Sequence, residues 1–99
     1  MEYTENQLAM LKVDLGLRTT TYEQDGYLCG LLNAAIQRLT RDGITLAPED
    51  AEHDQLVVMY AAWLYRKRGA DPDKTAMPQM LRTLHNNLLF GQKMAEAAE

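Results

Sequence analysis

The sequence predicts an all-α protein, namely one compact four-helix domain that spans residues 1–99, with its helices joined by short loops. Three observations support this prediction. Apolar residues recur three and four positions apart in several segments, which is the period of a helix. The alternation of apolar and polar residues that is typical of a half-buried strand is absent from the sequence. The length of 99 residues suits one domain with one hydrophobic core.

We expect the first helix at residues 4–15. Thr4 can cap its start, because Gln7 follows three residues later and completes a capping box. The helix then carries apolar residues on two faces. One face holds Met10 and Val13 and needs a partner other than the protein's own core. The opposite face suits that core and consists of Leu8, Leu11 and Leu15.

The second helix is expected at residues 21–41. It begins after Thr20 and Thr21, each of which is followed three residues later by an acid or an amide. In the loop behind it, Ile44 and Leu46 are apolar, although a solvated loop needs no apolar residues. The helix has one clear apolar stripe, which consists of Leu28, Leu31, Leu32, Ala35, Ile36 and Leu39.

The third helix, expected at residues 48–68, is the predicted centre of the fold. Pro48 suits its first turn, where a missing N–H is harmless. Acidic residues at its start and basic residues at its end complement the helix dipole. Between them lie ten consecutive apolar or aromatic residues, 56–65. A helix that is apolar all round is buried all round, so we expect Trp63 to be almost fully buried.

The fourth helix is expected at residues 78–97. Phe90 and Met94 lie off its core stripe and point the other way. From Gln92 onward the helical period is weak, which predicts a free tail that can become ordered on a partner. The core stripe consists of Met77, Leu81, Leu84, Leu88 and Ala95.

Composition excludes several classes of protein. The net charge of −4 and the pI near 5.1 argue against a free-standing DNA-binding protein, which usually carries a basic patch. The apolar run at 56–65 is too short to span a bilayer, so we expect no membrane association. The single cysteine, Cys29, permits no internal disulfide, and the polar N-terminus does not resemble a targeting signal. We therefore expect the protein to be cytosolic where it is made.

No pattern in the sequence predicts catalysis, a metal or a cofactor. His53 and His85 have no Cys, His or carboxylate at metal-binding spacing on the same face. Cys29 has no neighbouring base, and a glycine-rich phosphate loop is absent. The basic residues 66–68 could contact phosphate, but their position at a helix C-terminus explains them equally well.

Four stretches, which together span most of the chain, resemble the head–tail connector (head-completion adaptor) family of long-tailed bacteriophages and prophages. The stretches resemble the first segment of the family's proteins, their central helix, and their last helix, which contains a pair of adjacent asparagines. The stretches are Met10–Gly16, Leu56–Arg68, Met77–Arg82 and Leu84–Phe90.

This resemblance implies a structural virion protein without catalytic activity or cofactor. Members of the family form a ring, here expected to hold twelve subunits, between the portal protein and the stopper or tail-completion protein. The ring extends the channel through which double-stranded DNA passes. We therefore expect assembly in the host cytoplasm, followed by residence at the head–tail junction of the virion.

Candidate contact residues follow from the residues and the resemblance together. The apolar residues without a place in the core, Met10, Val13, Phe90 and Met94, are the candidate subunit interface. Because the C-terminal segment of the family engages the portal, Gln92, Lys93 and Met94 are candidate portal contacts. Loops at the opposite end meet the next protein, which makes Ile44 and Leu46 the candidate tail-side contact.

The alternative function is a small helical regulatory or DNA-binding module of phage or bacterial origin. A helix-turn-helix protein needs a basic recognition helix after a tight turn. The helix that follows Gly43 begins instead with acidic residues and continues with apolar ones. The sequence therefore disfavours this alternative.

Overall fold

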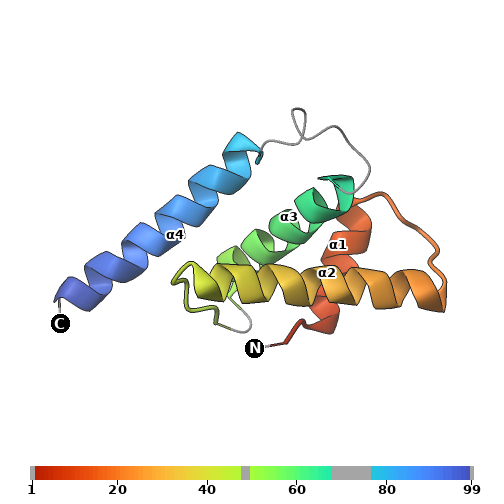
Figure 1. The fold of residues 1–99 in the computed structure, drawn as a ribbon, viewed down its shortest axis with the longest axis horizontal. Coiled ribbons are helices and arrows are strands. Elements are labelled where there is room, and N and C mark those ends of the chain that lie inside the picture. The colour runs from red at the N-terminus through yellow and green to blue at the C-terminus, as the bar shows by residue number, and fades with distance from the viewer. Residues whose placement is uncertain (1, 48–49, 68–76, 99) are drawn as a thin grey trace.

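The structure is a computed structural model that describes residues 2–47, 50–67 and 77–98. Within these ranges the chain forms helices and no strand, which confirms the all-α prediction. Helices α1, α2 and α3 cross one another to form the body of the molecule, and α4 lies along one side (Figure 1). The last turns of α4 extend beyond the body. The helices are α1 (Glu5–Asp14), α2 (Tyr22–Arg41), α3 (Ala51–Lys67) and α4 (Gln79–Ala98).

Capping boxes start the first two helices, as the sequence predicts. The Thr4 hydroxyl accepts a hydrogen bond from the Gln7 N–H at 3.1 Å, and the Gln7 side chain accepts one from the Thr4 N–H at 3.0 Å. Thr21 and Gln24 form the same reciprocal pair, with distances of 3.2 and 2.9 Å. These bonds satisfy N–H groups that have no partner within the helix.

The start of α3 differs from the prediction. The helix begins at Ala51, because the Asp50 carboxylate accepts hydrogen bonds from the backbone N–H groups of Glu52 and His53, at 3.0 and 3.2 Å. A short carboxylate in this position is a favourable N-cap. Pro48, which was expected in the first turn, lies outside the described residues, as does Arg68 at the other end.

The core lies where α2 and α3 cross, and α1 and α4 complete it. Leu11 of α1 and Leu81 of α4 are fully buried in it, whereas the other apolar residues predicted for the core on these two helices are half-buried, and Ala95 is exposed. Along α2 the predicted stripe is confirmed, with Leu31 at its edge. The buried core residues of α2 and α3 are Leu28, Leu32, Ala35, Ile36, Leu39, Leu56, Val57, Val58, Tyr60, Ala61 and Ala62.

One polar contact inside the core joins α1 to α3. The Gln7 amide nitrogen donates a hydrogen bond to the Asp54 carboxylate at 2.9 Å, and both side chains are buried. Gln7 therefore has two roles, since its amide oxygen also caps α1 through Thr4. Buried polar groups are tolerated only when they are hydrogen-bonded, so this contact fixes how the two helix starts meet.

The prediction that Trp63 is almost fully buried is wrong. Its side chain is half-buried at the edge of the core. The indole packs edge-on against Tyr60, with 5.5 Å between ring centroids, and the Lys67 ammonium lies 4.8 Å from the centre of a Trp63 ring. The other helices of this small chain cover α3 only in part, so a helix that is apolar all round keeps an uncovered flank.

This arrangement predicts that Leu56 contributes more to the stability of the protein than Trp63 does. Leu56 is fully buried, so Leu56→Ala should lower the free energy of unfolding by about 2–5 kcal/mol. Trp63→Ala should cost less than Leu56→Ala, because solvent already reaches part of the indole. Urea titrations of both variants measure the two values. A larger loss for the Trp63 variant would contradict the edge position.

Candidate interaction surface

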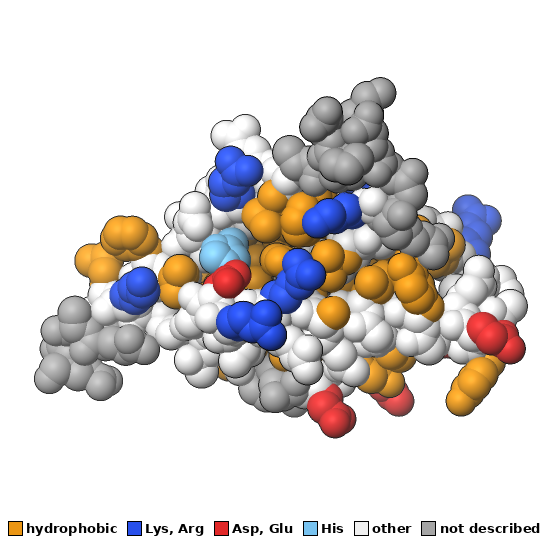
Figure 2. Space-filling model, in the orientation of Figure 1, with side chains coloured by type: hydrophobic (Ala, Val, Ile, Leu, Met, Phe, Trp, Pro, Cys, Tyr) orange, Lys and Arg blue, Asp and Glu red, His pale blue; other side chains and the backbone are white. Residues whose placement is uncertain are grey.

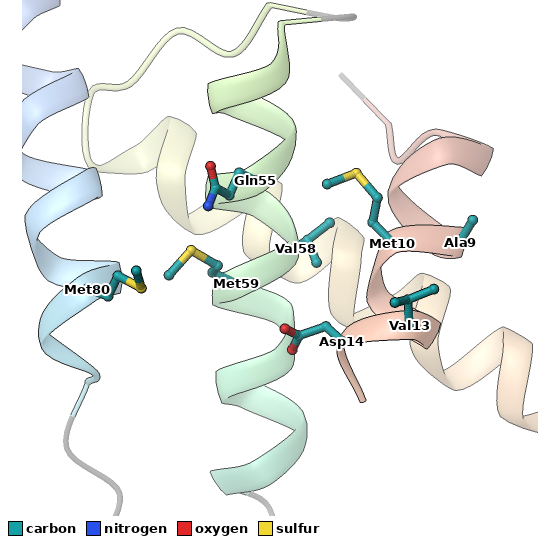
Figure 3. A pocket seen from close by; sticks show the side chains of 8 residues that line it. All are labelled: Ala9, Met10, Val13, Asp14, Gln55, Val58, Met59 and Met80. Atoms are coloured by element: carbon teal, nitrogen blue, oxygen red, sulfur yellow. The ribbon is translucent and has the colours of Figure 1, made fainter. Parts of the chain in front are cut away.

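An apolar groove runs between α1 and α3, and the first turn of α4 forms its far side. Its volume is about 550 Å³. Figure 3 shows Met80 of α4 and Met59 of α3 pointing toward one another, with Val58 of α3 between them and α1. We call this surface the methionine groove, and its lining residues are Ala9, Met10, Val13, Asp14, Gln55, Val58, Met59 and Met80.

The chemistry of the methionine groove suits an apolar partner. Val13 is 81% exposed and Met80 71% exposed, so large apolar side chains are held at the surface. Methionine side chains are flexible and polarisable, and they adapt to the shape of whatever packs on them. Asp14 and Gln55 are the polar residues in the lining. The groove is thus built for packing and lacks an acid–base pair at its centre.

A second apolar surface lies on the outer side of α4. Phe90 and Met94 stand one turn apart and are 70% and 66% exposed. Figure 2 shows hydrophobic side chains exposed along the outer edge of this helix. We call this pair the α4 knob. The predicted outward direction of both side chains is confirmed, and their role in a subunit interface stays a prediction.

The C-terminal segment is helical, which agrees with the predicted bounds of 78–97, and Gln92 attaches its start to the rest of the chain. Helix α4 continues to Ala98, and the Gln92 side chain is bonded to the loop after α2. Its amide nitrogen donates to the Gly43 carbonyl at 2.8 Å, and its amide oxygen accepts from the Thr45 N–H at 2.7 Å. Both ends of the Gln92 amide are therefore engaged within the chain, and its role as a portal contact stays a prediction.

Ile44, a candidate tail-side contact, is buried in this structure, and its role in such a contact stays a prediction. Its side chain is 1% exposed and belongs to the core, while Leu46 is half-buried and packs against the core. The backbone turns inward at Gly43, whose φ of 102° favours glycine, and the Ile44 N–H donates to the Leu39 carbonyl. Core packing thus explains why this loop contains apolar residues.

The basic residues at the end of α3 contact the protein itself. Arg66 donates to the backbone carbonyl and the carboxylate of Asp14, at 3.2 and 3.3 Å. Lys67 lies over the Trp63 ring. Arg68 lies outside the described residues. These contacts make α3 and the end of α1 one continuous surface, and they leave Asp14 at the rim of the methionine groove.

The histidines and the cysteine have structural partners. The His53 Nδ1 accepts from the Ala47 N–H at 2.9 Å, and the His85 Nε2 lies 3.1 Å from the Asp42 carboxylate. Cys29 is half-buried, and its hydrogen bond with Tyr3 raises the pKa of the Tyr3 hydroxyl. In the ranges that the structure covers, acids, histidines and the cysteine form no cluster that could hold a metal ion.

Comparisons of the chain with protein-family models, with curated proteins and with solved structures found no match. Among the described helices, none is both long enough and apolar enough to cross a membrane. The sequence signal for the methionine groove was the second apolar face of α1, which holds Met10 and Val13. The contribution of Met80 was missed, because its position beside Met59 depends on how α4 docks.

We predict that the Gln92 amide holds the loop against α4. Gln92→Ala removes both hydrogen bonds, so the Thr45 N–H should exchange with solvent faster and the protein should lose about 1 kcal/mol of stability. Hydrogen exchange measured by NMR reports on Thr45 directly. Lys93→Ala, at the exposed neighbouring position, is the control. Unchanged exchange at Thr45 in the Gln92 variant would show that the two hydrogen bonds of Gln92 do not hold the loop.

A second prediction concerns the ion pair that fixes the end of α1. A hydrogen bond from Thr20, together with Lys12 at 3.0 Å, lowers the pKa of Asp25 below its ordinary value of 3.8. A carboxyl group whose pKa is lowered by folding stabilises the protein above its unfolded pKa, and this contribution disappears as the pH falls through the folded pKa.

Asp25→Asn should therefore be less stable than the parent at neutral pH, and the two proteins should converge as the pH falls below 3.8. Thermal unfolding of both proteins over a pH series measures this difference. A gap that stays constant down to the lowest pH would mean that the charge of Asp25 has no stabilising role.

Proposed function

We propose that this protein is a structural subunit of a ring at the head–tail junction of a long-tailed bacteriophage or prophage. The ring would join the portal protein to the stopper or tail-completion protein and extend the DNA channel. One observation carries the proposal, namely that a single small chain exposes two separate apolar surfaces, the methionine groove and the α4 knob. The resemblance of its helices to the head–tail connector family supplies the biological context.

Two different apolar surfaces on one chain support head-to-tail assembly. When one patch of a subunit binds a different patch of the next, the contacts close into a ring if the rotation permits. A domain of this size buries a modest share of its surface, so additional burial between subunits also stabilises it. Gln92 and Lys93 are the proposed portal contacts, whereas Met94 is assigned to the contact between copies. Ile44 and Leu46 are the proposed contacts on the tail side.

The charge of the chain also supports a role as a DNA conduit. With a net charge of −4, a ring of such subunits repels the phosphates of double-stranded DNA and lets the duplex slide through. In this proposed function the protein has no catalytic activity and needs no cofactor. Its proposed sites are the host cytoplasm during assembly and then the virion.

The alternative of a regulatory or DNA-binding module has less support. Arg66 and Lys67, which could contact phosphate, are engaged by Asp14 and by the Trp63 ring. The helix that follows the turn at Gly43 begins beside the exposed acids Asp50 and Glu52. A recognition helix in the major groove needs the opposite charge at this position.

Mixing the purified protein with the portal protein of the same phage or prophage tests the proposal. Negative-stain microscopy should show an extra ring stacked on the portal, with the same symmetry around the channel. A portal from an unrelated phage is the control. If the cognate portal particles are the same with and without this protein, the connector function is ruled out.

A further inference from the structure

We infer that the contact between neighbouring copies is a knob-in-groove contact. Phe90 and Met94 of one copy insert into the methionine groove of the next copy. The inference rests on the proposed function for the ring itself, but the contact involves only this chain. It names the occupant of the groove, namely the exposed end of α4 of a second copy.

The two surfaces match in chemistry. The knob presents one aromatic ring and one thioether, spaced one helical turn apart, which is the anchor spacing of a helix that lies in an apolar groove. The groove presents Met10, Met59 and Met80 around an apolar floor. Sulfur atoms pack favourably against aromatic rings, so three flexible thioethers suit the Phe90 ring.

A knob cannot reach the groove of its own chain. Met80 lines the groove and lies on the same helix as Phe90, ten residues away, so the two are separated by about 15 Å along the axis. Helix α4 is held against the end of α2 by Gln92 at Gly43 and by His85 at Asp42. The knob therefore points away from its own groove and is available to another copy.

The charges around the two surfaces are complementary. Helix α4 carries two basic residues, Arg82 and Lys93, and one acidic residue, Glu96. Asp14 is the charged residue in the lining of the groove, and its carboxylate is 41% exposed beside Arg66. A helix with more basic than acidic residues that enters this groove meets one carboxylate, which favours it over an acidic surface.

Two charge substitutions test the contact, one on each surface. Val13→Asp alters the groove, Phe90→Asp alters the knob, and Tyr22→Asp alters an apolar residue that is 90% exposed and belongs to neither surface. All three positions are exposed, so circular dichroism should show unchanged helix content. Sedimentation velocity over a concentration series should show that self-association of the first two variants is weaker than that of the parent by about tenfold or more. Tyr22→Asp should associate like the parent.

Mixing the two defective variants is the decisive measurement. Val13→Asp keeps an intact knob and Phe90→Asp keeps an intact groove, so together they should form a dimer that contains one of each and does not grow further. Met80→Asp should replace Val13→Asp in this mixture with the same result, because it alters the same groove.

Three outcomes would overturn the inference: no dimer in either mixture, loss of assembly in the Phe90 variant alone, or a parent protein that stays monomeric at every concentration. Loss in the Phe90 variant alone would indicate that two α4 helices pair symmetrically. In each case the portal experiment still decides the proposed function separately, because it scores a ring on the portal and not the contact within it.

Discussion

The apolar surface all round α3 is the constraint on which the rest of the structure depends. A helix of this kind must be covered on every side, and a 99-residue chain has few other helices with which to cover it. Helices α1 and α2 bury Leu56, Val57 and Ala61 completely, and α4 adds Leu81 on another flank. Met59 and Trp63 remain half-buried on the flanks that are left. The methionine groove is thus the part of α3 that its own chain does not cover.

Hydrogen bonds and apolar contacts have separate roles in attaching α4. Leu81 supplies full burial near the start of the helix, and Leu84, Leu88 and Leu89 are half-buried along it. Apolar burial gives most of the stabilisation but little directional preference. The bonds from Gln92 to Gly43 and Thr45 do have direction, and they set which face of the helix turns outward. The exposure of Phe90 and Met94 follows from that orientation.

Polar contacts between helices also shape the methionine groove. Gln7 and Asp54 join the starts of α1 and α3 inside the core, and Arg66 joins the end of α3 to Asp14 at the end of α1. The two helices are therefore held at both ends, which keeps Met10 and Val13 beside Val58 and Met59. A groove that exists before its partner arrives loses little conformational freedom on binding. Such a preformed surface suits a subunit whose proposed role is assembly and not chemistry.

The sequence by itself determined the features that depend on neighbouring residues. The capping boxes at Thr4 and Thr21, the helical stripes and the outward direction of Phe90 and Met94 could be predicted, because capping bonds and the helical period involve residues three or four positions apart. The tertiary structure alone decided that Ile44 is buried, that Trp63 is partly exposed and that the Gln92 side chain is hydrogen-bonded to the loop after α2. Thr45 and Gln92 are separated by 47 positions, and no local pattern reports that they meet. The position of Met80 in the groove has the same origin, because the docking of α4 on α3 depends on the packing of the whole chain.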